Sequence, residues 1–326
     1  MSRDASTYVA LSGGVGGAKL SLGLAQLLGE RLSIVVNTGD DFEHLGLHIS
    51  PDVDTALYTL ADLVNAETGW GRREETWTFM AALAKLGGPT WFKLGDGDLA
   101  THVDRTARLA AGETLTAICA HFAAKLSVAA RVLPMTDDPV RTLVETDRGT
   151  LAFQEYFVRE QCQPVVRDIR YDGAAAAAPT RLVLDALAAP TLAGVIVCPS
   201  NPWLSVEPIL ALPGLRKALR AQGVPVIAVS PIIAGKAVKG PAAKIMADLG
   251  LAPDSRSIAW HYEGLIDGFV IDGADEALAA GMPMPAIVTD TMMRSLDDKL
   301  ALARQCLAFC EQLASGAGRE RTMVGR

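Results

Sequence analysis

The sequence has few aromatic side chains, few cysteines and no long apolar segment. Only 6% of its 326 residues are aromatic, and none of its five cysteines forms a Cys-x-x-Cys pair or a zinc-like cluster with histidine. A zinc centre is therefore not expected, and unpaired thiols are typical of a reducing compartment. Residues 1–8 lack the apolar run of a signal peptide, and no uninterrupted apolar stretch is long enough for a membrane span. We therefore predict a cytoplasmic protein.

Positive charge is also scarce. The chain has 30 basic and 37 acidic residues, which give a formal net charge of -7. Proteins that bind nucleic acids or membrane surfaces are usually basic, so neither partner is expected. An anionic ligand such as a nucleotide would need local positive groups or a metal ion. Half of the residues are hydrophobic, and a chain of this length can bury a substantial core.

The hydrophobic pattern predicts strands that alternate with helices. Residues 8–11 predict a short buried strand, 19–28 an amphipathic helix and 32–37 a second buried strand. This order is typical of the start of a Rossmann-like, doubly wound α/β fold with a mostly parallel sheet. Residues from about 55 to 126 have helical spacing, so we expect a helical insertion within a single domain that spans 1–326.

Further elements are expected along the rest of the chain. The strands are at 129–133, 142–146, 194–198, 224–230 and 268–272, and the helices are at 180–188 and 291–313. Several of the predicted strands end in polar turns. Because ligands of open α/β sheets bind beyond the carboxyl ends of the strands, we expect the site where these turns converge.

A glycine-rich loop, residues 11–19, joins the first strand to the first helix. Glycine permits positive φ and a close approach of the backbone, and the N–H groups at a helix start attract anions. The loop does not match the Walker fingerprint, because Ala18 and not glycine stands immediately before Lys19. It does not match the dinucleotide fingerprint either, because Lys19 stands where a third glycine belongs. The alternative is a tight turn alone, with Lys19 in solvent. The predicted phosphate contacts are Gly13, Gly14, Gly16, Gly17 and Lys19.

Acidic side chains follow the second strand and precede the helical segment. Asp40 and Asp41 end the strand, and Asp52 and Asp54 lie just before a helix expected from Thr55. Carboxylates beside a diphosphate need a cation between them, and Mg²⁺ prefers oxygen ligands. We predict Asp52 and Asp54 as metal ligands; the alternative is a helix cap.

A dense polar segment interrupts the helical region. Lys93, Asp96, Asp98 and His102 fall within ten residues, which indicates either a capped turn or a binding loop. His102 belongs to no recognisable catalytic triad and is by itself more typical of a structural histidine.

Three later turns also follow predicted strands. Asn201 offers a donor and an acceptor that suit a nucleobase or a hydroxyl group. The loop 230–244 contains three lysines that would supply the missing positive charge; a solvated loop is the alternative. Asp137, in the turn 134–139, is equally typical of a turn former.

Taken in order and spacing, these segments resemble one family. The resemblance covers about residues 9–272, and it is specific because several motifs occur together. The segments are 12–19, 36–38, 49–55, 93–102, 133–139, 199–202 and 230–244. The sequence resembles the 2-phospho-L-lactate transferases of coenzyme F(420) biosynthesis.

The resemblance implies a phosphotransferase with a Rossmann-like core. The alcohol 7,8-didemethyl-8-hydroxy-5-deazariboflavin would attack a guanosine diphosphate ester of lactate, enolpyruvate or glycerate. GMP would leave, a phosphodiester would form, and Mg²⁺ would assist. A homodimer is also implied. Such an in-line transfer needs positioning and charge neutralisation more than a protein nucleophile.

The same resemblance assigns roles to the candidate residues. Asp54 would be catalytic, orienting the attacking hydroxyl, and would also hold the metal. Gly97 stands where family members often have arginine, so a cationic contact that bears on acid specificity or deazaflavin binding is missing. The deazaflavin would contact Asp54, Lys93, Asp96, Asp98 and His102. Besides the glycine loop, the nucleotide would contact Asn201, Ser230, Lys239, Gly240 and Lys244.

Two other functions stay open at this point. A non-catalytic, nucleotide-sugar-binding regulator of the same fold would also carry a glycine loop, but it would not bind the deazaflavin. An NAD(P) oxidoreductase is disfavoured by the lysine in place of the third glycine.

Overall fold

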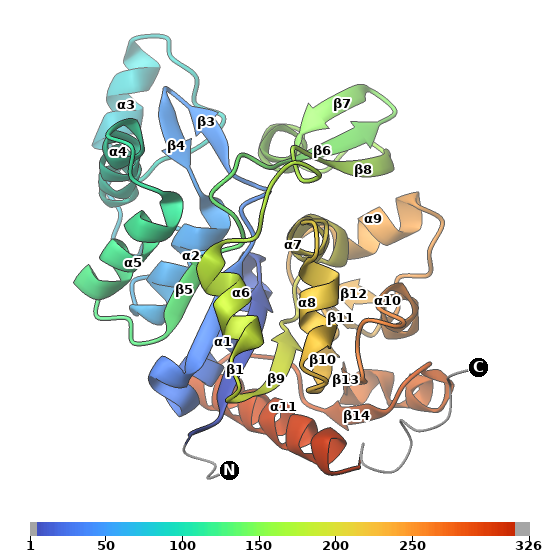
Figure 1. Ribbon diagram of the computed structural model, residues 1–326. Helices are drawn as coiled ribbons and strands as arrows, with labels where there is room; N and C mark the ends of the chain where they lie inside the picture. Colours follow the sequence, from blue (N-terminus) through green and yellow to red (C-terminus); the bar gives the residue numbers. More distant parts are fainter. Residues whose placement is uncertain (1–4, 317–326) are drawn as a thin grey trace.

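The computed structural model describes residues 5–316 and contains a central sheet of seven parallel strands (Figure 1). In spatial order the strands are β14 (Ala286–Thr289), β13 (Gly268–Asp272), β10 (Val226–Val229), β9 (Leu192–Val197), β1 (Thr7–Ser12), β2 (Leu32–Val36) and β5 (Arg131–Pro134). From β1 the chain adds β2 and β5 on one side and then returns to add β9 on the other. The strand order therefore reverses between β1 and β9, and the predicted Rossmann-like doubly wound fold is confirmed.

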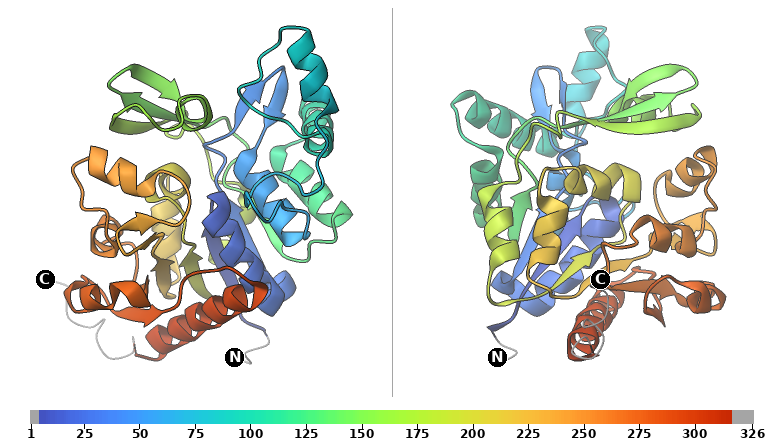
Figure 2. Two further views of the ribbon diagram at one scale, coloured as in Figure 1. Left: turned by 180° about the vertical axis from the view of Figure 1, so that it is seen from behind. Right: turned by 45° about the vertical axis from the view of Figure 1, so that its right-hand side comes forward.

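Helices cover both faces of this sheet because alternate residues of the strands point to opposite faces. In β1, Val9 and Leu11 belong to one core, and Tyr8 and Ala10 belong to the other. The first core lies under α6 (Arg181–Ala188) and α8 (Leu215–Ala221). The second lies under α1 (Gly14–Leu28) and α11 (Leu296–Gly316), which pack against each other (Figure 2, left).

The segment between β2 and β5 forms a cap beside the sheet. It contains the hairpin of β3 (Phe42–His44) and β4 (Leu47–Ile49), followed by α2 (Pro51–Leu60), α3 (Thr78–Lys85), α4 (Asp96–Ala110) and α5 (Leu115–Lys125). Two expected boundaries are wrong. The first helix of the cap, α2, starts at Pro51 rather than near Thr55, since proline suits the first turn of a helix. The expected loop 93–102 becomes helical at Asp96.

A small antiparallel sheet lies above the carboxyl edge of the main sheet (Figure 1). Its order is β7 (Gly149–Ala152), β6 (Arg141–Thr146) and β8 (Val166–Asp172). The strand expected at 142–146 exists, but it belongs here and not to the parallel sheet.

Short elements complete the described chain. They are η2 (Gly29–Arg31), η3 (Glu155–Arg159), η4 (Pro202–Val206), α7 (Glu207–Leu210), β11 (Ile232–Ile233), β12 (Lys236–Ala237), α9 (Ala242–Asp248), α10 (Ser255–His261) and η5 (Gly273–Gly281). Within residues 5–316, none of the helices has both the length and the apolar character that a membrane crossing requires.

Candidate active site between the sheet edge and the helical cap

A cavity of about 860 Å³ opens at the carboxyl edge of the parallel sheet. Turns after four strands line it, contributing Gly13 from β1, Asp40 from β2, Asn201 from β9 and Ser230 from β10. This convergence follows from the parallel order of the strands and their switch point between β1 and β9. The turn after β5 does not line the cavity, because its Asp137 accepts hydrogen bonds from Thr116 at the start of α5.

The glycine loop is packed tightly against the turn after β9. The Gly13 N–H donates to Ser200 Oγ at 3.3 Å, and that hydroxyl donates back to the Gly13 carbonyl at 2.8 Å. A Cβ on Gly16 would lie 2.2 Å from the carbonyl oxygen of Pro199, and one on Gly17 would lie 2.7 Å from Ser200 Oγ. The glycines at these two positions are therefore required by loop-to-loop packing, whatever ligand the loop meets.

The helix expected from Lys19 in fact begins inside the glycine loop, at Gly14. Gly14 has a φ of 62°, in the left-handed region that glycine tolerates. Its N–H donates to Asp52 Oδ1 at 2.7 Å. A carboxylate of the protein itself thus occupies a donor that the sequence assigned to phosphate.

Asp52 lies in the first turn of α2 and is buried against the glycine loop. Its Oδ2 accepts from Asn37 Nδ2 at 2.9 Å. Burial raises the pKa of Asp52 to about 6, although the hydrogen bonds from Asn37 and Gly14 oppose this. Burial also raises the pKa of Asp40 well above its ordinary value, and the nearby Asp52 charge adds to that effect.

Two cationic side chains line the cavity on the side of the sheet. Lys19 lines it and donates to the carbonyl of Met293 at 3.1 Å. Burial, together with the positive charges of Lys299 and Lys239, lowers the pKa of Lys19. Lys239 and Gly240 line the cavity from the loop after β12, where Lys239 Nζ lies 3.5 Å from the carbonyls of residues 67 and 68 in the cap.

The other predicted nucleotide contacts differ in placement. Asn201 lines the cavity and uses its Oδ1 to cap η4, while its Nδ2 is buried without a hydrogen-bond partner. Ser230 lines the cavity but bonds internally to Ile232 and Ser255. Lys244 does not line it, because its ammonium pairs with Asp248 on the same helix.

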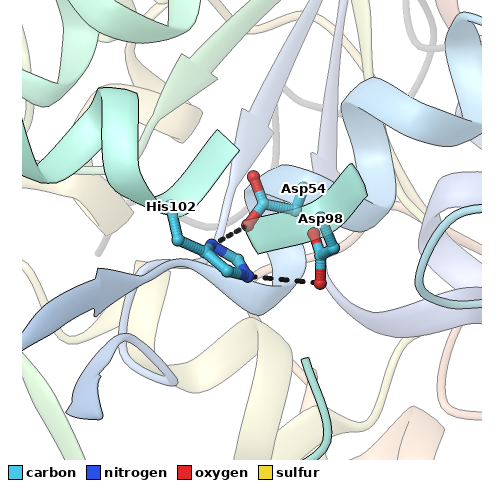
Figure 3. A group of neighbouring side chains, drawn as sticks. All are labelled: Asp54, Asp98 and His102. Carbon is cyan, nitrogen blue, oxygen red and sulfur yellow. Dashed lines mark ion pairs between the residues drawn. The ribbon is translucent and has the colours of Figure 1, made fainter. Parts of the chain in front are cut away.

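The cap side of the cavity holds a buried charged group (Figure 3). Asp54, on α2, bonds through Oδ1 to the guanidinium of Arg105, whose side chain is 0% exposed. His102 lies between two carboxylates, with Nδ1 3.6 Å from Asp54 Oδ2 and Nε2 3.2 Å from Asp98 Oδ2. Asp98 and His102 share one face of α4 because they are four residues apart.

Tyr58, on α2, completes this group. Its hydroxyl donates to Asp98 Oδ1 at 2.8 Å. Although burial opposes it, the contacts with His102 and Tyr58 lower the pKa of Asp98. Burial and the charges of Asp54 and Asp98 raise the pKa of Tyr58 well above its ordinary value. Tyr58 is therefore a neutral hydrogen-bond donor at neutral pH.

The remaining residues of the 93–102 segment divide between the cavity and the cap itself. Lys93 lines the cavity and is exposed. Asp96 points to α3, where its carboxylate accepts from Thr76 Oγ1 and from the backbone N–H of Thr78 and Phe79. The Gly97 N–H donates to Glu75, and a Cβ at Gly97 would lie 3.3 Å from Arg72 Nε.

The residues present fit a divalent cation on the cap side. Asp54, Asp98 and His102 offer ligand atoms within 4.8 Å of one another. Asp54 Oδ2 is buried without a hydrogen-bond partner, and such an atom needs a proton or a cation. His102 Nε2 lies 3.2 Å from Asp98 Oδ2. Asp52, the other predicted ligand, is not in this group and faces the glycine loop.

The sequence alone did not single out Arg105, Tyr58 or five further aromatic side chains that line the cavity, here called the aromatic wall. The spacing of His102 and Arg105, three residues apart in a helix, could have indicated a shared face. The side chains of the aromatic wall come from three separate segments, so no pattern within one segment predicts them. The aromatic wall consists of Trp70, Trp91, Phe92, Phe153 and Phe157.

Comparisons with known proteins identify the family. The model of the family "2-phospho-L-lactate transferase CofD" matches residues 8–285. The chain is 40% identical to a phosphoenolpyruvate transferase of Streptomyces griseus over 94% of this chain and 98% of that protein. It is 38% identical to a 2-phospho-L-lactate transferase of Methanocaldococcus jannaschii over 93% and 98%.

A solved structure supports the fold alone. A UPF0052-family protein of Bacillus halodurans superposes with a TM-score of 0.60 at 14% identity, over 93% of this chain and 98% of that one. The sequence matches carry the functional assignment. The chain belongs to the 2-phospho-L-lactate transferase CofD family and is a transferase of coenzyme F(420) biosynthesis.

Proposed function

We propose that this transferase joins the phosphoryl-acid part of a guanosine diphosphate ester to the deazaflavin alcohol and releases GMP. The observation that carries the proposal is one cavity with two chemically different sides. The glycine loop and two lysines line it from the sheet side, the group of Asp54, Asp98 and His102 lines it from the cap, and five aromatic side chains line it as well. A volume of about 860 Å³ is within the range of ligand sites, large enough for extended substrates.

In the proposed reaction, the side-chain hydroxyl oxygen of the deazaflavin attacks the phosphorus that carries the acid. A new O–P bond forms, the P–O bond to the GMP phosphate breaks, and GMP takes the bonding electrons. The hydroxyl proton passes to a base in the site and then to solvent. The protein contributes position and charge, as in other phosphoryl transfers.

The sheet side suits the guanosine diphosphate. Gly13 caps α1, and Gly14, Gly16 and Gly17 form its first turn, where the helix dipole favours negative charge. Lys19 and Lys239 supply cationic groups, and Asn201 Nδ2 is a spare donor for a base or a ribose. We propose that Ser230 and Gly240 shape this side through their backbone.

The cap side suits the deazaflavin. Its planar ring system would pack against the aromatic wall, and Lys93 at the rim would meet a polar edge of the ring. Asp54, Asp98 and His102 lie where the attacking hydroxyl would enter. Asp54 is the residue that we propose orients this hydroxyl, since its Oδ2 is buried and unpartnered.

Mg²⁺ is the metal that the chemistry favours. When bound, it would neutralise charge on the diphosphate and polarise a phosphoryl oxygen. We propose that Asp54 and Asp98 hold it, because Mg²⁺ prefers carboxylate oxygens. The net charge of the two carboxylates and the buried Arg105 is about -1, which leaves the site attractive to a cation.

Mass spectrometry of the product tests this function. The protein is incubated with Mg²⁺, the deazaflavin and, in separate reactions, the guanylylated forms of lactate, enolpyruvate and glycerate. We expect GMP and a deazaflavin phosphodiester with at least one acid; the relatives' names point to phosphoenolpyruvate and 2-phospho-L-lactate. Binding of a nucleotide sugar, with no deazaflavin binding and no product from any acid, would support the non-catalytic regulator instead.

A further inference from the structure

Arg105 contacts two members of the cap-side group at once. It lies on α4, one turn beyond His102. One terminal nitrogen, Nη2, donates to Asp54 Oδ1. The other, Nη1, lies 3.3 Å from His102 Nδ1 and also donates to the carbonyl of His48 at 3.3 Å. A guanidinium fork that is fully buried and bonded to three groups has little freedom to move.

These contacts determine which nitrogen of His102 carries the proton. A guanidinium has donors and no acceptor, so in the contact between Arg105 and His102 the imidazole Nδ1 must accept. A neutral imidazole has one protonated and one unprotonated nitrogen. If Nδ1 accepts, the proton is on Nε2.

The charges around the ring favour the same assignment. His102 Nδ1 lies 3.3 Å from Arg105 Nη1, so a proton on Nδ1 would point toward an N–H of Arg105 and two hydrogen-bond donors would face each other. Nε2, in contrast, lies 3.2 Å from Asp98 Oδ2, and the proton on this nitrogen has an anionic neighbour.

We propose that Arg105 is a positioning residue that fixes His102 as the Nε2–H tautomer. His102 then presents a hydrogen-bond donor to Asp98 and the substrate, and it offers no lone pair to a metal ion. The cation falls to carboxylate oxygens alone, with Asp54 turned so that Oδ1 meets Arg105 and Oδ2 stays available. The link to catalysis rests on the proposed function; the tautomer itself does not.

Nitrogen NMR of the histidine side chains measures the tautomer directly. The chain has five histidines, so protein labelled with ¹⁵N only at histidine gives a small set of ring signals, and His102→Gln identifies those of His102. We expect His102 to show a protonated Nε2 and an unprotonated Nδ1. Addition of Mg²⁺ should leave the Nε2 proton in place. A protonated Nδ1, or loss of the Nε2 proton on adding Mg²⁺, overturns the proposal.

Arg105→Lys tests the positioning role. Lysine keeps the charge, but its single head group cannot hold Asp54 and His102 together. We expect the His102 ring to change to Nδ1–H, donated to Asp54 Oδ2, which lies 3.6 Å away. By analogy with other residues that orient metal-site ligands, kcat should fall roughly tenfold to a hundredfold, with KM for the guanylylated acid unchanged.

Arg108→Lys is the matched control, since Arg108 is on the same helix and pairs with Asp104 at the surface. It should leave both the His102 signals and kcat as in the wild type. A folded Arg105→Lys protein with an unchanged His102 spectrum would contradict the positioning role. The wild-type spectrum needs no turnover and only His102→Gln for its assignment, so it stands even if Arg105→Lys fails to fold. A correct tautomer without transferase activity would overturn only the proposed function.

Discussion

The two sides of the cavity differ in how they use their polar groups. On the sheet side, the conspicuous glycine loop is largely occupied by the protein itself, since Gly13 bonds to Ser200 and Gly14 to Asp52. On the cap side, Asp54 Oδ2 is buried without a hydrogen-bond partner, and His102 Nε2 lies 3.2 Å from Asp98 Oδ2. The difference indicates that the glycine loop mainly sets the shape of the sheet side, whereas the cap keeps a carboxylate oxygen with unused bonding capacity.

The largest expected contrast is in stability. Arg105→Met would leave the Asp54 carboxylate buried without its cation and should lower the free energy of unfolding by about 3–5 kcal/mol. The matched variant Arg73→Met removes an exposed pair with Asp62 and should cost about 0–1 kcal/mol. Urea denaturation of the two variants measures the difference. Equal costs would show that the cap-side group is not a tightly coupled buried unit.

The next largest effect is a loss of stability, which we expect because the glycine loop is tightly packed. In Gly16→Ala the new Cβ would meet the Pro199 carbonyl at 2.2 Å, so we expect a loss of about 1–3 kcal/mol in stability from the forced shift. Gly273→Ala is the control, because nothing lies within 4 Å of its Cβ position. Thermal unfolding compares the two. If Gly16→Ala is as stable as the control, the loop is not held by packing.

The pH dependence of stability sharpens the account of the sheet side. Because burial raises the pKa of Asp52 from 3.8 to about 6, the folded state binds more protons than the unfolded state between these values. The contribution of Asp52 to stability is therefore fully present below about pH 4 and is lost as the pH rises through about 6. Asp52→Asn should remove this slope from the pH profile of the unfolding free energy. An unchanged slope would assign it to another group.

The smallest expected effect is a difference in KM between variants of two lysines, Lys239 and Lys244, that lie close together in the chain. Lys239 lines the cavity, whereas Lys244 pairs with Asp248 outside it. Loss of one contact from an exposed cationic side chain is worth about 1 kcal/mol, so Lys239→Met should raise KM for the guanylylated acid about fivefold. Lys244→Met should leave KM near the wild-type value. Steady-state kinetics would contradict this arrangement if Lys244→Met had the larger effect.

Sequence patterns predicted six of the seven strands of the central sheet because these strands are short, largely buried and bounded by turns; they missed β14, which is only partly buried. They also placed the site at the carboxyl edge, as the strand order requires. They failed where distant segments decide the outcome. Asp96 was grouped with Asp98, but the two point different ways once α4 begins at Asp96. Arg105 was missed because its role depends on α2, which is about fifty residues earlier in the chain.

The most direct test of the cap side as the reactive side is the turnover of Asp54→Asn, with Asp62→Asn as control. Both positions belong to α2 or its end, but Asp62 is exposed and adopts a φ of 55° that asparagine tolerates. With saturating Mg²⁺ and both substrates, and with circular dichroism confirming the fold, kcat of Asp54→Asn should fall about a hundredfold or more, while Asp62→Asn retains wild-type kcat. Full turnover by a folded Asp54→Asn protein would contradict the account.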